Sequence, residues 1–281
     1  MLQFGIRGHD MPNAPVEEWV SNIRKAGFCC TQLALPKAFT SFNTDPSAMT
    51  SGMAMYLRNL FAQNDVKVAV LGCYHNLATP DKEQLKKTQE IYKTHIRFAS
   101  LLGCGLVGTE TGAVNTEYKP CPENHTDAAL DTFIEGLKPV VEYAEKMGVC
   151  VGIEPVWNHI MHTPERTKKV VEAIDSPNLR VIFDPINMFN AENEAHGNDI
   201  VDKMFDILLN EIDVIHLKDY VVKDGKIVSR PVTLGEGRFD IPHLFGIIKR
   251  KKPFINVLLE DSLPDNVEAS KAYVRKCYEE A

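Results

Sequence analysis

Eight short apolar segments, each followed by a longer amphipathic segment, recur along the whole chain. Several of the short segments are continuous runs of Val, Ile and Leu without polar alternation, which is typical of parallel strands covered by helices. They occupy residues 2–7, 29–35, 67–71, 106–109, 150–154, 180–184, 214–218 and 256–260. Eight consecutive βα units favour a closed (β/α)8 barrel over an open sheet.

The amphipathic segments carry the boundary signals of helices. The first opens at Pro15 with acidic residues in its first turn. Gly136 and Pro139 interrupt the pattern of 126–147, which predicts a kink or a later start for that helix. A TIM barrel needs about 250 residues, and no linker rich in Pro, Gly or Ser divides the chain. We therefore interpret residues 1–281 as a single α/β TIM-barrel domain.

Composition excludes several classes of protein. The net charge of −7 opposes a surface built to neutralise nucleic-acid phosphates. No apolar run approaches the ~20 residues of a membrane span, and the N-terminal sequence lacks a secretory apolar region. The seven cysteines are odd in number and lie mostly in apolar runs, which indicates reduced thiols. We expect a cytoplasmic protein that binds neither nucleic acid nor membrane.

The turn after the first apolar segment also argues against a dinucleotide-binding enzyme. An open nucleotide-binding sheet carries Gly-x-Gly-x-x-Gly at that turn. This chain has Gly-Ile-Arg-Gly-His at 5–9, which lacks the phosphate-binding pattern.

In four later segments a side chain that can bind a metal ion directly follows the apolar run. These side chains are Glu154, Asp184, His216 and Glu260. In a barrel the C-terminal ends of the strands converge on one mouth, so the four should meet there. Three carboxylates and one imidazole form a hard ligand set for one divalent ion. Mn²⁺ or Mg²⁺ suits this set best, and the imidazole leaves Co²⁺ and Zn²⁺ as alternatives.

Five short segments carry a resemblance to a known family. They are Gly-Ile-Glu-Pro at 152–155, Phe-Asp-Pro-Ile-Asn at 183–187, Ile-His-Leu-Lys-Asp at 215–219, Leu-Gly-Glu-Gly at 234–237 and Leu-Leu-Glu-Asp at 258–261. With these segments in this order, the chain resembles the xylose-isomerase-like TIM barrels, also described as sugar phosphate isomerases/epimerases. That superfamily holds sugar isomerases, ketose 3-epimerases, hydroxypyruvate isomerases, inosose dehydratases and endonuclease IV. The resemblance implies that Glu154, Asp184, His216 and Glu260 are the metal ligands, and that the two Glu also act as acid and base.

Three positions depart from the pattern of the ketose 3-epimerases. Those enzymes usually carry a substrate-binding His where this chain has Asn187. They also tend to place a second Glu at the position of Ile160 and an Arg at that of Val222. These departures set the chain apart from a 3-epimerase in the narrow sense.

The chemistry that fits this ligand set is proton removal from a carbon next to a carbonyl. A divalent ion stabilises the enediolate, and two carboxylates on opposite sides of the carbon exchange the proton. We therefore expect a metal-dependent isomerase or epimerase of a small sugar or sugar derivative. An inosose-dehydratase-like lyase is the alternative on the same residues. An endonuclease IV-type repair enzyme would need three metals, more His ligands and a basic groove.

Further polar or aromatic residues near the strand ends are candidates for substrate contact, although each also has a plain structural interpretation. The candidates are Arg7, His75, Glu110, Trp157, Asn187, Lys218 and Arg238. The glycines beside Arg238 suggested a phosphate contact, because the region of strands 7 and 8 often binds phosphate in TIM barrels. Related barrels often form dimers or tetramers, so a homo-oligomer is compatible with the resemblance.

Overall fold

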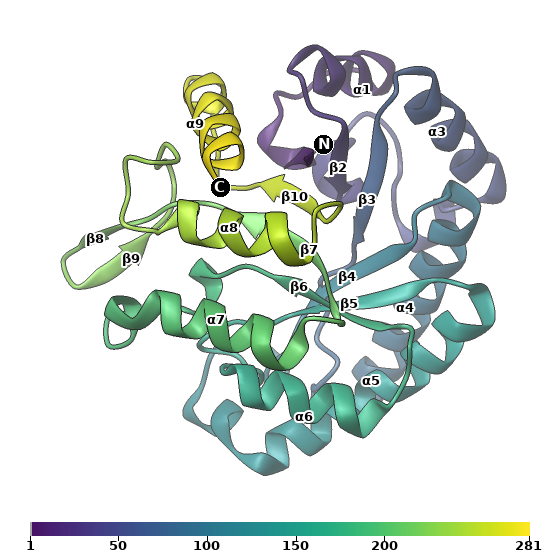
Figure 1. Ribbon diagram of the computed structural model, residues 1–281. Helices are drawn as coiled ribbons and strands as arrows, with labels where there is room; N and C mark the ends of the chain where they lie inside the picture. Colours follow the sequence, from purple (N-terminus) through teal and green to yellow (C-terminus); the bar gives the residue numbers. More distant parts are fainter. Residues whose placement is uncertain (1) are drawn as a thin grey trace.

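The computed structural model describes residues 2–281, and within them eight parallel strands close into a barrel (Figure 1). The barrel strands are β1 (Gln3–Arg7), β2 (Cys30–Leu33), β3 (Lys67–Gly72), β4 (Leu106–Glu110), β5 (Cys150–Glu154), β6 (Leu179–Phe183), β7 (Ile212–Leu217) and β10 (Asn256–Leu259). They lie around the barrel in chain order, and β10 closes the ring by pairing with β1. The prediction of a single (β/α)8 barrel is confirmed.

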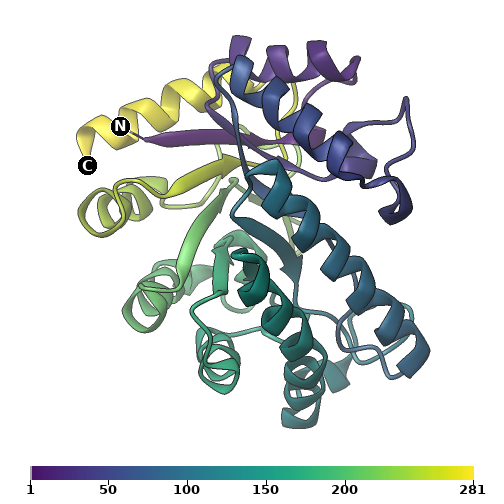
Figure 2. The ribbon, with the colours of Figure 1, turned by 90° about the vertical axis from the view of Figure 1, so that its right-hand side faces the viewer.

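Helices surround the barrel because each parallel connection must cross over the outside of the sheet (Figure 2). They are α1 (Val16–Lys25), α2 (Leu35–Ala38), α3 (Ser51–Gln63), α4 (Lys82–Leu102), α5 (Asp127–Met147), α6 (Pro164–Ile174), α7 (Gly197–Leu208), α8 (Ile241–Lys251) and α9 (Val267–Glu280). Side-chain caps fix several helix starts, such as Thr126 at α5, whose hydroxyl accepts a hydrogen bond from Ala129 N. A large apolar core packs between these helices and the strands.

Alternation along the strands decides which side chains face the barrel interior. A small apolar cluster fills the interior below the mouth, and its members are Cys30, Val70, Leu106, Ile182, Val214 and Leu258. Gly152 makes room for this cluster, because a Cβ there would lie 3.0 Å from Ile182 Cδ1. The next inward positions along the strands therefore lie at the C-terminal mouth, above an apolar floor.

The helix predicted over 126–147 differs from expectation. It forms one continuous helix, α5, with Pro139 inside it. Gly136 is needed for a different reason, since a Cβ at this position would lie 1.9 Å from the backbone oxygen of Leu77. The loop after β3 thus packs directly on the backbone of α5, and the glycine permits that close approach.

Two local features were not predicted. Residues 34 and 35 were assigned to the second strand, but β2 ends at Leu33 and a single helical turn, α2, follows with Pro36 near its start. The antiparallel hairpin β8 (Val221–Lys223) and β9 (Lys226–Val228) lies between β7 and α8 (Figure 1). Asp224 and Gly225 form its turn with φ values of 50° and 70°, as a two-residue hairpin requires.

The structure also describes the state of the cysteines and the character of the helices. All seven cysteines are free thiols. Across residues 2–281, none of the helices combines the length and the apolar character needed to cross a membrane.

Candidate active site

The inward positions at the mouth carry a ring of polar side chains. Glu154 ends β5, and Asp184 directly follows β6. His216 lies near the end of β7, and Glu260 directly follows β10. These four side chains are nearly or completely buried, with exposed fractions of 3%, 0%, 0% and 6%. Buried ionisable groups need partners of opposite charge, so their arrangement decides what the site can bind.

Three of these side chains form a compact cluster. One ligand atom from each of Glu154, Asp184 and His216 lies within 4.8 Å of the others. Glu260 joins through the imidazole, because its Oε1 lies 3.2 Å from His216 Nδ1. Glu154 Oε1 lies at the same distance from that nitrogen. The two glutamates therefore converge on one imidazole nitrogen.

The carboxylates of the cluster surround two groups that can carry positive charge, His216 and Lys218, as the ligands of a metal ion would surround the ion. His216 Nδ1 faces two carboxylates, and its buried Nε2 has no hydrogen-bond partner within residues 2–281. Asp184 Oδ1 accepts hydrogen bonds from the backbone nitrogens of Ile186 and Asn187, at 2.9 and 3.1 Å. Its Oδ2 faces the Lys218 ammonium at 2.8 Å. A proton and an ammonium thus balance carboxylates that are also suitable ligands for a divalent ion.

The same contacts shift the pKa values of the cluster. Burial disfavours the imidazolium, but the carboxylates of Glu260 and Glu154 outweigh this effect and raise the pKa of His216 to about 9. Burial raises the pKa of Asp184 to about 6, against the attraction of Lys218. For Glu154, burial is outweighed by His216, Lys218 and Asn187, which hold its pKa below the ordinary value. Glu154 is therefore ionised at neutral pH.

Asn187 and Lys218 link the cluster to its surroundings. Asn187 Nδ2 donates to Glu154 Oε1 at 2.7 Å, and its Oδ1 accepts from Lys218 Nζ at 2.7 Å. Lys218 also lies 3.8 Å from Glu260 Oε2. This chain of contacts orients Glu154 and places a positive charge between Asp184 and Glu260.

Arg7 contacts Glu260 from the end of β1. Its guanidinium lies 3.2 Å from Glu260 Oε2, 3.0 Å from Asp10 Oδ1 and 2.6 Å from Asp261 Oδ1. These carboxylates outweigh the effect of burial and raise the pKa of Arg7 above its ordinary value. The charge of Arg7 is fully engaged by protein groups, and its main effect is to orient Glu260.

A cavity of about 350 Å³ opens above this cluster. Its lining residues are Arg7, His9, Gln32, Lys37, Tyr74, Glu110, Glu154, Asn187, Lys218 and Glu260. The volume is in the range of pockets that hold small metabolites. Glu110 faces Glu154 in the strand register, and burial and the neighbouring carboxylates raise its pKa to about 7.

Four of the sequence-predicted substrate contacts line this cavity, namely Arg7, Glu110, Asn187 and Lys218. His75 is exposed, and its backbone exchanges hydrogen bonds with the Tyr92 hydroxyl. Trp157 is 40% exposed on the loop after β5, and its backbone nitrogen donates to Asn187 O at 2.8 Å. His75 and Trp157 are not among the residues that line the cavity.

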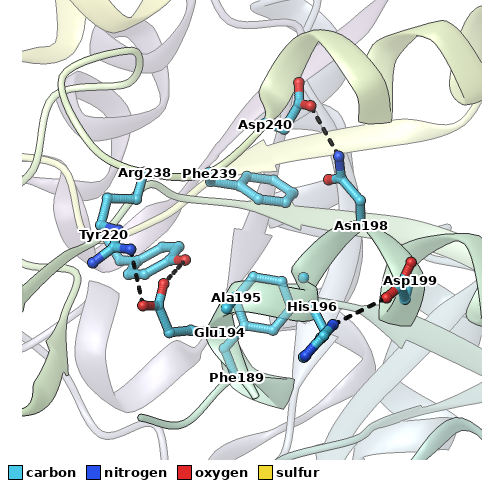
Figure 3. A pocket seen from close by; sticks show the side chains of 11 residues that line it. Phe189, Glu194, Ala195, His196, Asn198, Asp199, Tyr220, Arg238, Phe239 and Asp240 are labelled. Carbon is cyan, nitrogen blue, oxygen red and sulfur yellow. Dashed lines mark hydrogen bonds and ion pairs between the residues drawn. The ribbon is translucent and has the colours of Figure 1, made fainter. Parts of the chain in front are cut away.

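Arg238 lines a separate pocket of about 190 Å³ beside the start of α7 (Figure 3). Its guanidinium lies 3.0 Å from Glu194 Oε1, and the Tyr220 hydroxyl donates to Glu194 Oε2 at 2.8 Å. Figure 3 shows both side chains directed at Glu194, so the charge of Arg238 is already balanced there.

Sequence reasoning did not select Gln32, Lys37 and Tyr74, which complete the cavity on the side of β1 to β3 together with His9, a residue that the end of the first strand had indicated. Side chains alternate between the two faces of a strand, and Gln32 lies two residues after Cys30 of the interior cluster. This spacing indicates that Gln32 faces inward. Lys37 lies on α2, a short helical turn that the sequence pattern did not predict.

The chain was compared with proteins of known sequence and structure. A family model described as xylose isomerase-like TIM barrel matches residues 20–277. An uncharacterized protein of Methanocaldococcus jannaschii is 28% identical over 167 residues, which are 58% of this chain and 54% of that protein. The match thus spans about half the length of that relative.

Several solved structures share the fold over nearly the whole chain. A D-tagatose 3-epimerase-like protein is 20% identical with a TM-score of 0.76, covering 99% of this chain and 97% of its own. A 3-keto-D-glucoside 4-epimerase from E. coli is 14% identical with a TM-score of 0.77, covering 99% and 100%. A probable 3-DHS dehydratase from Bacillus anthracis is 14% identical with a TM-score of 0.75, covering 98% and 99%.

At these identities the structural likenesses concern the fold. The family model rests on sequence, and its match extends from within α1 into α9. The chain belongs to the xylose isomerase-like TIM barrel family.

Proposed function

We propose that this protein is a divalent-metal-dependent isomerase or epimerase of a small sugar or sugar derivative. The observation that carries the proposal is the convergence of Glu154 and Glu260 on His216 Nδ1, each at 3.2 Å, within a polar cavity of about 350 Å³. Two carboxylates that flank one position can remove a proton from a carbon and return it. Membership in the family and the sugar epimerases among the similar structures agree with this reaction class.

Glu154, Asp184, His216 and Glu260 are the residues that would hold the metal ion. When bound, a divalent ion supplies Lewis-acid stabilisation of the negative charge that develops on the substrate oxygens. The donor set is three carboxylates and one imidazole, which suits Mn²⁺ or Mg²⁺. The proton on His216 and the ammonium of Lys218 occupy the same negative environment in the metal-free protein.

The side chains have distinct tasks in the proposed reaction. One glutamate removes the proton next to the substrate carbonyl, and the other donates a proton to the same or the neighbouring carbon. Asn187 orients Glu154, and Arg7 orients Glu260. The apolar floor formed by the interior cluster excludes water from below and keeps these electrostatic interactions strong.

Deuterium incorporation tests this proposal without knowledge of the product. Ketoses, aldoses, their phosphates and inososes are incubated with the protein and Mn²⁺ in deuterated water, and exchange at carbon next to the carbonyl is followed by NMR. Glu154→Gln and Glu260→Gln should each reduce exchange by about a hundredfold or more, as expected for loss of a general acid or base. Treatment with a chelator should stop exchange, and added Mn²⁺ should restore it.

Glu142→Gln is the matched control, because Glu142 is exposed on α5 and is not among the residues that line the cavity. The Glu142→Gln protein should catalyse deuterium exchange into the substrate at the rate of the unaltered protein. Full exchange in both active-site variants, with folding unchanged, would exclude the two glutamates from the chemistry.

A dehydration at the same site is a second candidate, and Glu110 favours it. Its pKa is raised to about 7 by burial and by Glu154 and Glu260, so a large fraction is protonated at neutral pH. A protonated carboxyl in the cavity can donate its proton to a departing hydroxyl group. Loss of one water from the product, measured by mass spectrometry and abolished in Glu110→Gln, would identify the lyase.

A further inference from the structure

The cavity has two chemically different sides. The side formed by β5, β6, β7 and β10 carries Glu154, Asp184, His216 and Glu260. The other side, here called the β1–β3 wall, consists of His9, Gln32, Lys37 and Tyr74. In a ring of eight strands, β2 lies across the barrel from β6. Lys37, just after β2, and Asp184, just after β6, therefore lie on opposite sides of the mouth.

Lys37 differs from the other two cations that line the cavity. Arg7 is paired with three carboxylates, and Lys218 lies within 4.0 Å of Asp184, Glu260 and Asp261. Within residues 2–281, no carboxylate oxygen lies within 4.0 Å of Lys37 Nζ. Lys37 Nζ lies over the ring of Tyr74, 5.9 Å from the ring centroid. Lys37 thus offers a positive charge that the protein does not neutralise.

No acid on the β1–β3 wall competes for that charge. Asp10, which follows His9 in the chain, is held by Arg7 at 3.0 Å and by Arg230 at 3.6 Å. Burial lowers the pKa of His9 to about 4, and the positive charges of Arg7, Lys37 and Arg230 act in the same direction. His9 is therefore a neutral imidazole, and the electrostatic environment around it is positive.

Two buried polar atoms on the wall lack partners. Gln32 is 1% exposed, and its Nε2 donates to the Tyr74 hydroxyl at 2.6 Å. Its Oε1 is buried without a hydrogen-bond partner among residues 2–281, and the same holds for His9 Nδ1. Buried polar atoms are almost always paired with protein or with ordered water, so these two atoms are free to contact a bound molecule that displaces water from the cavity. Gln32 Oε1 can accept from a hydroxyl, and His9 Nδ1 can donate in one tautomer.

We propose that the substrate carries an anionic group, a carboxylate or a phosphate, at the end remote from the reacting carbon, and that Lys37 binds this group. His9 donates a second hydrogen bond to it, and Gln32 accepts from a substrate hydroxyl nearby. The inference rests on the proposed function for the orientation of the substrate. The presence of an anion site at Lys37 is a separate claim, and it is testable separately.

Ketoses that differ only at carbon 6 provide the test. D-fructose, D-fructuronate and D-fructose 6-phosphate carry a hydroxyl, a carboxylate and a phosphate at that carbon. Isothermal titration calorimetry with Mn²⁺ present should show one or both anionic ketoses binding about tenfold more tightly than D-fructose, as expected for one charge-assisted contact. Preference for D-fructuronate identifies a carboxylate site, and preference for D-fructose 6-phosphate identifies a phosphate site.

Lys37→Gln should abolish the preference by weakening the binding of the anionic ketoses more than that of D-fructose, whereas Lys37→Arg should retain most of the preference. Lys37 is exposed, so both variants should fold. Lys146→Gln, which alters an exposed lysine in the last turn of α5, is the matched control. Equal affinity of the intact protein for all three ketoses would overturn the inference. An equal loss of affinity for all three ketoses in Lys37→Gln would overturn the inference as well.

Acetate and inorganic phosphate, titrated alone, separate this inference from the proposed function. If no ketose exchanges deuterium but Lys37→Gln still weakens the binding of either anion, the isomerase proposal fails and the anion site stands. If D-fructose exchanges deuterium and the affinity for every anion tested is independent of Lys37, the anion site is wrong and the isomerase proposal stands.

Discussion

Asn187 lies between the two charged groups on which the proposed chemistry depends. It donates to Glu154 and accepts from Lys218, both at 2.7 Å. A hydrogen-bonded amide in this position both orients the carboxylate and favours its ionised form. Its role is therefore to position Glu154, whatever contact it also makes with substrate.

Asn187→Ala should lower the rate of deuterium exchange about 10- to 100-fold, the usual effect of removing such a partner. Loss of the donated hydrogen bond should also raise the pKa of Glu154, which would move the acidic limb of the pH–rate profile to higher pH. Asn210→Ala is the control, because the backbone oxygen of this exposed residue is the atom that contacts Arg180. A lower rate with an unshifted profile would contradict the positioning role.

At this scale the sequence predicts part of the candidate site. An acid or imidazole after an apolar run places Glu154, Asp184, His216 and Glu260 at strand ends, and the barrel brings strand ends together. The same reasoning selected His75, which is exposed, and Arg238, which pairs with Glu194 in another pocket. Strand ends indicate the mouth but not the direction of a loop side chain, because loop conformation depends on packing that a local pattern does not encode.

Among the elements, α5 shows how one backbone contact can override helix propensity. Replacing a helical glycine with alanine normally stabilises a helix by about 1 kcal/mol. At Gly136, however, a Cβ would lie 1.9 Å from the Leu77 backbone oxygen. The loop after β3 has no flexible side chain at that point that could move aside.

Gly136→Ala should therefore destabilise the protein by about 3 kcal/mol or more, the upper part of the range for overpacking. The measurement is the free energy of unfolding from denaturant titration. Gly105→Ala is the control, because a Cβ at Gly105 would meet nothing within 4 Å. Stability equal to or above that of the unaltered protein would show that α5 can shift away from the loop.

The element pattern was predictable because parallel strands and their covering helices differ strongly in apolar periodicity. Segment 150–154 coincides with β5, and the other strands differ by a few residues at their ends. The hairpin β8–β9 was missed because each strand has three residues, too few to show alternation. Its Asp224-Gly225 turn was the available signal.

For the whole molecule, buried histidines contribute to the dependence of stability on pH. The pKa values of His9, His159 and His162 are each lowered to about 4, primarily by burial. In the unfolded chain a histidine has a pKa near 6.5, so between pH 6.5 and 4 the unfolded state binds more protons than the folded state. Their contribution to stability is complete above pH 6.5 and is lost as the pH falls to 4. Glu110 and Asp184, with raised pKa values, act in the opposite direction over a similar range.

The contribution of one histidine is measured by comparing the pH dependence of stability of its variant with that of the unaltered protein. His162 packs against His125 with ring centroids 3.9 Å apart, away from the cavity lining. His162→Gln should lose less stability than the unaltered protein between pH 6.5 and 4, as measured by thermal unfolding at several pH values. The exposed His196→Gln should follow the unaltered protein. Parallel curves for all three proteins would show that His162 protonates equally in the folded and unfolded states.

The ring of strands is completed by contacts between the two ends of the chain. β10 pairs with both β1 and β7, and Arg7 reaches Glu260 across the same seam. Detachment of β10 would therefore expose the hydrogen-bonding edges of β1 and β7 together. Open edges can pair with other chains. Local unfolding of residues 256–259 alone is consequently enough to turn a closed barrel into a sheet with two edges open to association.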